Sequence, residues 1–451
     1  PINDTYSYLS NFWMSDCYFH LGDYNKSIDG YSRLTISSVD NLSYYENLKN
    51  YNLAYSYFQT QDYINAVKWF RIYEKAASDS MKINDTYLRI ADGYFMTSNF
   101  YLSNKYYDKA LEINLFDTDY ALYQNSLSLG LISKDTSRIK LLKRIILDFT
   151  NSSYYDNSLN DLAEYYKNNS DYELAKEYYD SLILSTDDDD LIANAYLSKG
   201  MINFNSGKIE LAIDEFLFVV NNYQKTKYFK ESLSALQSAY SSLARIDEYL
   251  IVVESLPEIS ITKLEQDSLT YNTAFMKFSE MDYEVSKNAF DKYLQTFENG
   301  FFINDARYYN AISSLKVGDT INAVINYQKV LESTSTNHKE NSLIFLARRS
   351  YNSGDYEKSN IYYAKLSDFA SSNSIKRELV IRLMMGNEHI DRIVALKYAK
   401  QVIELDKTDN WLLSKAYIII ARNEFDSGNY AKSKSTFKTV SNLSFYDEGA
   451  E

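Results

Sequence analysis

One arrangement of apolar, small and polar residues recurs along the chain. Each copy has a small residue, a polar turn of the Gly-Asp-Tyr type, a second small residue and then an aromatic residue. The turn residues are Asp23, Asp62, Asp171, Asp282, Asp319, Asp355 and Asn429 in clear copies, and Asn99, Asp135, Lys208, Asp247 and Asp391 in weaker ones. They are 35 to 39 residues apart, with a mean near 37. A register kept along the whole chain indicates about twelve repeats.

Small residues recur at two fixed places in the repeats, and each of the two places has a small residue in ten of the twelve repeats. Eight residues before the turn stand Ser15, Ala54, Ala91, Leu127, Ala163, Gly200, Ala239, Ala274, Ala311, Ala347, Leu383 and Ala421. Four residues after it stand Ser27, Ala66, Ser103, Ile139, Ala175, Ala212, Ile251, Ser286, Ala323, Ser359, Ala395 and Ser433. Small side chains there let two antiparallel helices approach closely. Each repeat is therefore predicted to be a helix, a tight turn and a second helix.

An aromatic residue stands eight residues after the turn in nine repeats. The residues at this place are Tyr31, Phe70, Tyr107, Lys143, Tyr179, Phe216, Ser255, Phe290, Tyr327, Tyr363, Ala399 and Phe437. They lie one helical turn beyond the second small residue, on the same face of the helix. A ring there fills the space between one hairpin and the next. Because neither helix can bury its face alone, the hairpins must stack.

This pattern resembles the tetratricopeptide repeat family over nearly the whole chain. The resemblance implies an all-α fold, a right-handed α-α superhelix of helix-turn-helix repeats. Two features depart from the family: the usual period is 34 residues, and the proline that often closes the second helix is absent. The extra residues lie between repeats, as in 149–158 and 297–306. They are similar to the longer linkers of bacterial cell-envelope members, such as the outer-membrane-assembly lipoproteins and the Tol–Pal-associated periplasmic coordinator. This subtype implies a periplasmic or outer-membrane-associated location, while a cytoplasmic one stays open.

We expect one solenoid over residues 1–451. Repeats four, seven and eleven deviate most, because Lys143, Ser255 and Ala399 replace the aromatic residue. Pro257 ends or bends its helix, so a kink is predicted there. The chain has no initiator Met, and residues 446–451 read like the start of another helix. We therefore expect a fragment of a longer or processed chain.

Composition narrows the class of protein. Only 12 Gly and 2 Pro in 451 residues fit long stretches of helix. A net charge of -14 argues against nucleic-acid binding, which needs a basic surface. Residues 339–438 nevertheless carry 17 Lys and Arg against 12 Asp and Glu, a net charge of +5. The acidic remainder favours basic partners, or it is ordinary solvated helix surface. No apolar run approaches the roughly 18 residues that span a bilayer.

The sequence predicts no catalytic, metal or cofactor site. Phosphate-loop, dinucleotide, metalloprotease and nucleophile-elbow motifs are absent. His20, His338 and His389 have no partner at metal-ligand spacing. Cys17 is predicted to be a small buried hydrophobe. The acidic run 187–190 lacks the alternating ligands of a calcium loop, so it is predicted to begin a helix.

The family resemblance implies that the first helix of each repeat lines a concave groove in which a protein or peptide partner lies. When the family's groove positions are transferred to this chain, they fall eleven and seven residues before each turn. The partner-binding candidates are Tyr51, Tyr55, Asp92, Tyr240, Phe275, Tyr308, Arg348 and Arg422. Exposed aromatic residues and arginines are common binding anchors. The alternative is that several of them pack between helices. The Lys- and Asn-rich set that clamps a peptide carboxyl terminus in some members is not evident.

The sequence thus predicts a non-enzymatic scaffold for a protein or peptide partner, in a bacterial cell-envelope assembly. The alternative is the sensory or interaction region of a larger regulator whose output domain lies outside this chain. A catalytic domain outside this chain would be needed for an enzyme. RNA binding by the related 35-residue helical repeats is a further alternative, against which the acidic balance weighs. The oligomeric state stays open.

Overall fold

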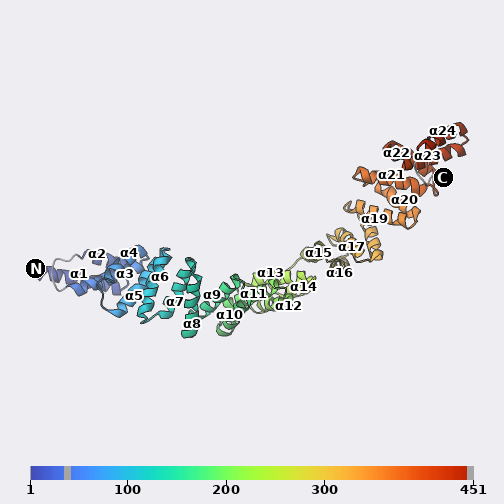
Figure 1. Ribbon diagram of the computed structural model, residues 1–451. Coiled ribbons are helices and arrows are strands. Elements are labelled where there is room, and N and C mark those ends of the chain that lie inside the picture. The colour runs from blue at the N-terminus through green and yellow to red at the C-terminus, as the bar shows by residue number, and fades with distance from the viewer. Residues whose placement is uncertain (1, 35–41, 444–451) are drawn as a thin grey trace. The chain divides into compact units, whose positions relative to one another are not determined.

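The computed structural model describes residues 2–34 and 42–443 (Figure 1). In this part of the chain every regular element is an α-helix, and the 24 helices form twelve consecutive hairpins. The predicted all-α solenoid of about twelve helical repeats is therefore confirmed. The helix expected in residues 446–451 lies outside the described residues. The chain divides into two compact units, Pro1–Leu236 (unit 1) and Gln237–Glu451 (unit 2).

Odd-numbered helices are the first helices of the repeats and even-numbered ones the second helices. The helices of unit 1 are α1 (Ile2–His20), α2 (Tyr24–Ser32), α3 (Ser43–Gln59), α4 (Tyr63–Tyr73), α5 (Ser80–Met96), α6 (Phe100–Ile113), α7 (Thr118–Leu131), α8 (Asp135–Asp148), α9 (Tyr155–Asn168), α10 (Tyr172–Ser185), α11 (Asp189–Asn205) and α12 (Ile209–Asn222). The boundary between the units falls within α13 (Phe229–Ser242).

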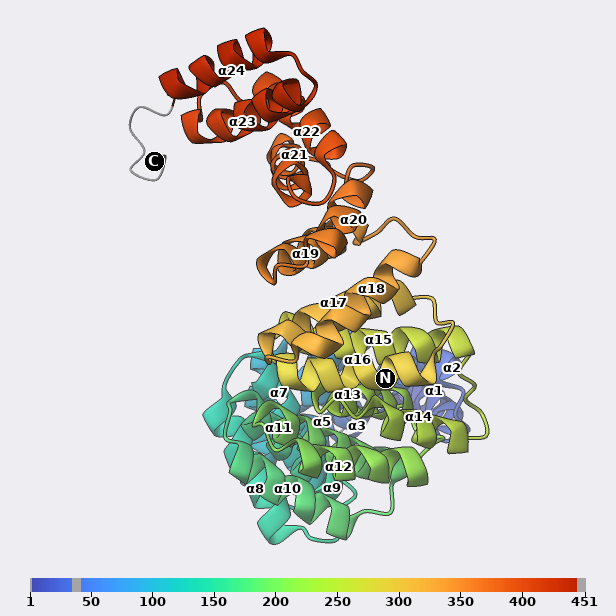
Figure 2. The ribbon, with the colours of Figure 1, turned by 90° about the vertical axis from the view of Figure 1, so that its right-hand side faces the viewer.

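Unit 2 continues with the same hairpins, and Figure 2 shows α19–α20, α21–α22 and α23–α24 following one another. Its remaining helices are α14 (Ile246–Ser255), α15 (Lys263–Ser279), α16 (Tyr283–Thr296), α17 (Ile303–Lys316), α18 (Thr320–Glu332), α19 (Lys339–Asn352), α20 (Tyr356–Leu366), α21 (Asn373–Asn387), α22 (Arg392–Leu405), α23 (Asn410–Asp426) and α24 (Tyr430–Leu443). Pro257 follows the end of α14, and Thr262 caps α15 with Glu265. The single solenoid and the kink near Pro257 stay predictions.

The recurring Asp or Asn of the turn begins the second helix. The Asp62 side chain accepts a hydrogen bond from the backbone N–H of Asn65 at 3.1 Å. The same bond is made by Asp23, Asn99, Asp171, Asp282, Asp319 and Asp355. Such an N-cap satisfies one of the free N–H groups at the start of a helix. Counted from this N-cap, the small residues stand at −8 and +4 and the aromatic residue at +8.

The turn of repeat four is one residue earlier than predicted. The N-cap of α8 is Lys134, not Asp135, and its side chain makes no capping bond. Position +8 is therefore Leu142, which is fully buried, and not Lys143, which is half-buried. Because Lys134 does not cap the helix with its side chain, the neighbouring Asp135 resembles the N-cap in the sequence.

The turn of repeat seven is two residues earlier than predicted. Arg245 is the N-cap of α14, and Asp247 lies in the first turn of that helix. Position +8 is then Val253, which is buried, whereas Ile251 and Ser255 are exposed. Here too the N-cap side chain makes no capping bond. Asp247, the nearest Asp, therefore resembles the N-cap in the sequence.

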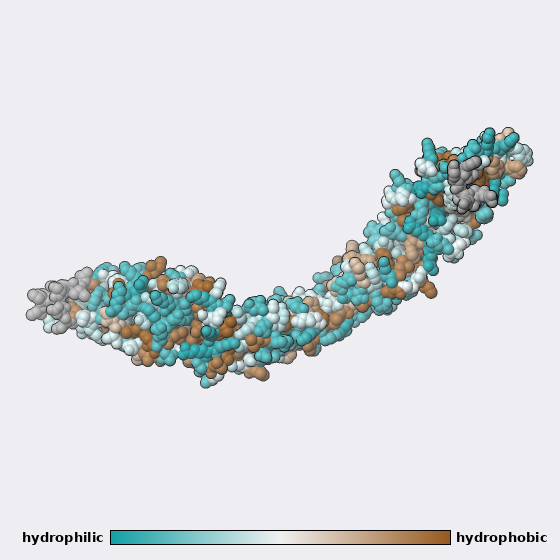
Figure 3. Space-filling view, viewed as in Figure 1, coloured by the Kyte–Doolittle hydropathy of each residue, from teal (hydrophilic) through white to brown (hydrophobic). Residues whose placement is uncertain are grey.

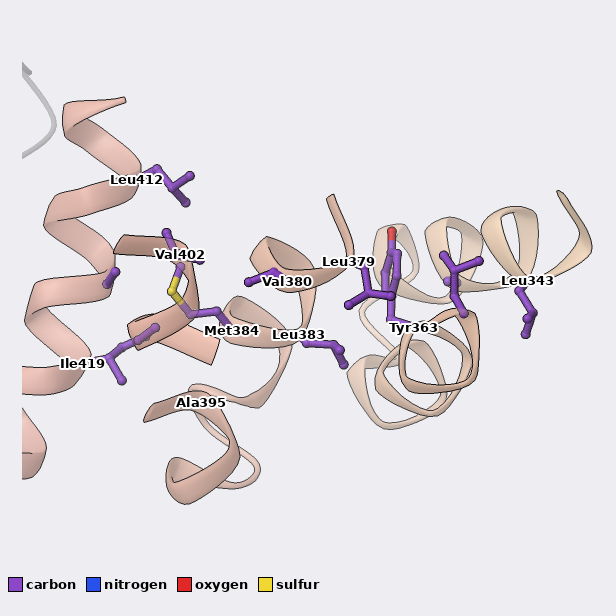
Figure 4. Packing of buried hydrophobic residues seen from close by; sticks show 14 residues of the cluster. Leu343, Tyr363, Leu379, Val380, Leu383, Met384, Ala395, Val402, Leu412 and Ile419 are labelled. Atoms are coloured by element: carbon purple, nitrogen blue, oxygen red, sulfur yellow. The ribbon is translucent and has the colours of Figure 1, made fainter. Parts of the chain in front are cut away.

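The aromatic residues at +8 form the core of the repeats. Eight of the nine are buried, as predicted, namely Tyr31, Phe70, Tyr107, Tyr179, Phe216, Phe290, Tyr327 and Tyr363. Figure 4 shows Tyr363 beside Leu343 and Leu379, residues of the first helices on either side of α20. Phe437 in the last repeat is the exception and is 40% exposed. The surface over these cores is mostly hydrophilic, with scattered apolar patches (Figure 3).

A polar residue at −15 ties the inter-repeat loop to the first helix of its own repeat. Seven repeats have such a residue, namely Asn47, Asn84, Asp119, Asp156, Asp267, Asn304 and Glu340. Asp119 accepts a hydrogen bond from Ser152 Oγ at 2.6 Å, and Asp267 accepts one from the backbone N–H of Phe301 at 2.6 Å. The loops that lengthen the period to about 37 residues are thus fixed by local hydrogen bonds.

Candidate functional site

Tyr51 and Tyr55 lie on α3, where they face α5. The Tyr51 hydroxyl donates a hydrogen bond to Asp85 Oδ2 at 2.6 Å, and its ring centroid lies 5.2 Å from that of Tyr73. The Arg89 guanidinium lies 6.0 Å from the Tyr55 ring centroid. Both tyrosines are half-buried. They therefore hold two neighbouring first helices together while keeping part of each ring exposed.

Asp92 on α5 is buried and has three hydrogen-bond donors. Its Oδ1 accepts from the hydroxyls of Tyr107 at 2.6 Å and Tyr120 at 2.7 Å, and its Oδ2 accepts from Arg89 at 2.9 Å. Burial nevertheless raises the pKa of this carboxyl group above its usual range. The carboxylate of Asp92 is thus engaged in hydrogen bonds within the fold.

The arrangement at Asp92 recurs in two other repeats of unit 1. Position −7 is a carboxylate that accepts a hydrogen bond from the tyrosine at +8. The three pairs are Asp16–Tyr31 at 2.9 Å, Asp92–Tyr107 at 2.6 Å and Glu164–Tyr179 at 2.5 Å. Where position +8 is Phe70, Phe216 or Phe290, position −7 is Tyr55, Met201 or Phe275. An acid at −7 therefore serves a buried tyrosine in these repeats.

Tyr240 lies at −5 and not at −7, because the N-cap of α14 is Arg245. Its backbone carbonyl accepts the turn hydrogen bond from Arg245 N–H at 2.9 Å, and its side chain is buried. The Arg245 guanidinium lies 5.7 Å from its ring centroid. The shifted register thus places Tyr240 in the last turn of α13.

Phe275 and Tyr308 are half-buried in unit 2. The Phe275 ring packs edge-on against Tyr309, with centroids 4.9 Å apart. The Tyr308 ring stacks on His338 at 3.9 Å, and His338 Nε2 lies 2.7 Å from Asp305 Oδ1. Both predicted residues therefore take part in aromatic packing between adjacent repeats.

Arg348 on α19 is exposed and borders an open cleft. Its Nε donates a hydrogen bond to Glu378 Oε1 at 2.7 Å, which lowers the pKa of that carboxyl group. The cleft of about 700 Å³ is lined by Leu315, Thr320, Asn341, Ile344, Phe345, Arg348, Arg349, Asn352 and Ser353. Two arginines and two asparagines thus lie beside apolar side chains that a ligand could cover.

Arg422 on α23 lies at the same position −7 and borders a second cleft of about 480 Å³. Its guanidinium is 3.4 Å from Glu388 Oε1, and its side chain is 64% exposed. Exposed Phe425 and Phe437 line the same cleft. The two predicted arginines therefore have the same setting, an exposed cation next to apolar surface.

The structure brings three of the eight predicted residues together. Tyr55 and Asp92 are bridged by Arg89, and Arg89 also approaches Asp85, to which Tyr51 donates. Sequence reasoning missed Arg89 and Asp85. Their spacing with Asp92 on one helix, i to i+4 and i to i+3, was the signal that could have found them.

Other candidate chemistry has ordinary surroundings. Cys17 is exposed, so its predicted burial is wrong: it lies at −6, off the face of α1 that packs on α2. The acidic run does begin a helix, because Asp188 caps α11. In the described part of the chain, no three His, Cys, Asp or Glu side chains gather as metal ligands would. No helix there is long and apolar enough to cross a membrane.

The family model of the tetratricopeptide repeat matches residues 156–187, which contain α10 and nearly all of α9. This match supports the tetratricopeptide repeat family for the chain. No curated protein matches it.

Several solved structures align with the chain at low sequence identity. The chain aligns with one chain of the structure of Naa15/Naa10 bound to HypK-THB at 14% identity and a TM-score of 0.41, covering 98% of this chain and 64% of that one. The apo form of RapI aligns at 14% identity and a TM-score of 0.41, covering 72% and 96%. The C-terminal part of a TPR repeat-containing protein from Cytophaga hutchinsonii aligns at 15% identity and a TM-score of 0.33, covering 64% and 97%.

Proposed function

We propose that this chain is a non-enzymatic scaffold that holds a protein or peptide partner along its first helices, in a bacterial cell-envelope assembly. The observation that carries the proposal is the setting of Arg348 and Arg422. Both lie at −7 on first helices, both are exposed, and each borders a cleft with apolar walls. Arginine beside apolar surface is a typical binding anchor, because it combines charge, hydrogen bonds and a flat apolar face.

The first-helix surface of unit 1 differs from these clefts, because its predicted site residues have partners within the fold. The carboxylate of Asp92 accepts hydrogen bonds from donors within the fold. Tyr51 and Tyr55 pack between helices. An alanine substitution at those residues would weaken the fold as well as any binding. Arg348 and Arg422 are better test positions, because exposed ion pairs contribute little to stability.

The cell-envelope context rests on the long linkers between repeats. The test is fractionation of the native host with an antibody against this chain. Recovery with the periplasm or outer membrane is expected. Recovery in the cytoplasm alone would remove the cell-envelope part of the proposal and leave the scaffold part in place.

The scaffold proposal is tested by affinity capture from the native host with quantitative mass spectrometry. The bait is residues 1–451, unchanged or with Arg348→Glu and Arg422→Glu. The most enriched partner should fall at least tenfold with this variant. The matched control reverses two exposed cations on second helices of unit 2, Lys358→Glu and Lys397→Glu. Equal recovery with all three baits, or an equal loss with the control, would reject the first-helix surface as the binding site.

A further inference from the structure

The second helices of repeats two, three and four carry a row of unpaired lysines. Lys68, Lys105 and Lys140 all stand at position +6, on α4, α6 and α8. All three are exposed, and among the described residues none of them has an acidic partner. Figure 1 shows these three helices following one another in unit 1. A position that recurs in each repeat thus presents the same charge three times in succession.

The row begins at a cleft of about 490 Å³ beside α4. Lys68, Arg71 and Lys75 line it together with Tyr94 of α5. The closest contact of Arg71 is weak, a 3.5 Å approach to the Tyr94 hydroxyl. Like charges that outnumber their counter-ions repel one another, so an anionic ligand would relieve this repulsion.

The carboxylate that caps the C-terminal end of α4, Glu74, already has partners. Glu74 accepts a hydrogen bond from the Tyr106 hydroxyl at 3.2 Å, and its other oxygen lies 3.7 Å from Lys109 Nζ. It is therefore held by the next repeat, and although its charge also acts on Arg71, it has no ion pair with Lys68 or Lys75 among the described residues.

Apolar side chains are interleaved with the cations. Ile64 is 74% exposed and Ile72 is 38% exposed, and both line the cleft. With Lys68 between them, they follow the i, i+4, i+8 spacing of one helix face. A ligand that fits this surface carries apolar groups as well as negative charge.

The sign of position +6 changes on both sides of the row. It is Asp29 in repeat one, Glu177 in repeat five and Asp214 in repeat six, all exposed. Residues 1–236 carry a net charge of −10. A flat anionic membrane or a long nucleic acid would meet these acidic neighbours, whereas a short segment would not.

We propose that the second-helix face of repeats two to four binds an acidic, partly apolar segment of a partner protein, separately from the first-helix surface. The lysine row supplies the charge, and the cleft beside α4 receives the apolar side chains. The chain would then hold two partners on two faces.

The test uses a fluorescein-labelled synthetic peptide of four Glu-Glu-Leu units and measures its fluorescence anisotropy with residues 1–451 at low and moderate salt. The variant Lys68→Glu, Arg71→Glu, Lys105→Glu should lower the affinity at least tenfold. The matched control is Lys225→Glu, Lys227→Glu, Lys230→Glu, three exposed lysines of the same unit away from the row, and it should change the affinity less than twofold.

Two further measurements separate the apolar contribution to binding from the contribution of charge. Ile64→Ser should weaken binding at least threefold, because it removes buried apolar area and no charge. A peptide with Gln in place of every Glu should not bind. Because all substituted side chains are exposed, unchanged circular dichroism is expected.

The proposal is overturned by unchanged affinity of the triple variant, by an equal loss in the control variant, or by binding of the Gln peptide. It is also overturned by unchanged affinity of Ile64→Ser. Vesicles of phosphatidylserine and phosphatidylcholine form the last arm. Capture of vesicles through the three cations, without peptide binding, would assign the face to a membrane instead.

Discussion

Most carboxylates of unit 1 with shifted pKa values are buried within the repeats, whereas those of unit 2 accept hydrogen bonds from cations, hydroxyls or backbone N–H groups. Burial raises the pKa of Asp92, Asp108, Asp161 and Glu215, all in unit 1. Contacts with cations or backbone N–H groups lower the pKa of Glu248, Asp355, Glu378 and Asp406, all in unit 2. Exceptions in unit 1 are the exposed Asp23 and Glu173, which pair with lysines.

Position −7 shows what this difference means for function. In unit 1 it holds acids that accept hydrogen bonds from buried tyrosines, as in the pair Asp92–Tyr107. In unit 2 it holds Arg348 and Arg422, which lie at the surface beside clefts. The same helical position thus contacts a buried tyrosine in three repeats of unit 1 and is exposed beside a cleft in two repeats of unit 2.

The largest expected effect is the loss of Asp92. Asp92→Ala leaves two buried phenols and the Arg89 guanidinium without their acceptor. Breaking a buried pair by removing one partner costs about 3–5 kcal/mol. Urea unfolding of the variant, followed by circular dichroism, should show a loss of this size in the transition of unit 1. A loss below about 1 kcal/mol would mean that the carboxylate is not structural, and the comparison between the units would fail.

Two opposite exchanges at +8 sharpen the comparison. Tyr107→Phe removes a hydrogen bond to a charged acceptor and should cost about 1.5–3 kcal/mol. Phe290→Tyr in unit 2 buries a hydroxyl opposite Phe275, where no carboxylate stands, and should cost about 1–3 kcal/mol. Both are measured by urea unfolding. If Phe290→Tyr is neutral, the acid at −7 is not what allows a tyrosine at +8.

Acid should weaken unit 2 before unit 1. A raised pKa, as at Asp92, means that protonation favours the folded state, so its contribution to stability increases as the pH falls from neutral. A lowered pKa, as at Glu378, gives stability that is present above its unfolded pKa and is lost as the pH falls below it. The gain at Asp92 is complete once the pH has fallen to its unfolded pKa, near 4, whereas the loss at Glu378 begins below its unfolded pKa, about 4.5. As the pH falls, these groups therefore stabilise unit 1 above about pH 4 and destabilise unit 2 below about pH 4.5.

The three tryptophans allow each unit to be followed separately, since Trp13 and Trp69 lie in unit 1 and Trp411 lies in unit 2. Fluorescence is titrated with acid in Trp411→Phe, which reports unit 1, and in the double variant Trp13→Phe, Trp69→Phe, which reports unit 2. The transition at Trp411 should occur at the higher pH. The reverse order would contradict the assignment of the two carboxylate classes.

The fold could be predicted from the sequence because its determinants are local and repeated. A capping Asp, small residues at −8 and +4 and a ring at +8 together define each hairpin. The prediction of the turn was wrong where Lys134 and Arg245 are the N-caps, since their side chains make no capping bond. At these two turns no capping residue in the sequence marks the start of the second helix.

The site was harder to predict, because the role of position −7 depends on its neighbours in space. Asp92 and Arg348 stand at equivalent positions, but one faces the hydroxyl of Tyr107 and the other a cleft. A partial signal was present: the acids at −7 occur only in repeats with Tyr at +8, although the repeats of Tyr327 and Tyr363 have Ile312 and Arg348 at −7. The clefts themselves depend on the spacing of hairpins, which no residue pattern in one repeat specifies.

The smallest expected effect on stability is that of Arg348→Ala, the counterpart of Asp92→Ala in unit 2. The side chain is 55% exposed, and an exposed ion pair contributes less than about 1 kcal/mol. Glu378 also keeps a hydrogen bond from the Tyr363 hydroxyl at 3.0 Å. Urea unfolding should therefore give a free energy within about 1 kcal/mol of the unchanged protein. A loss as large as that of Asp92→Ala would make position −7 structural in both units, and the arginine would no longer distinguish a surface open to a partner.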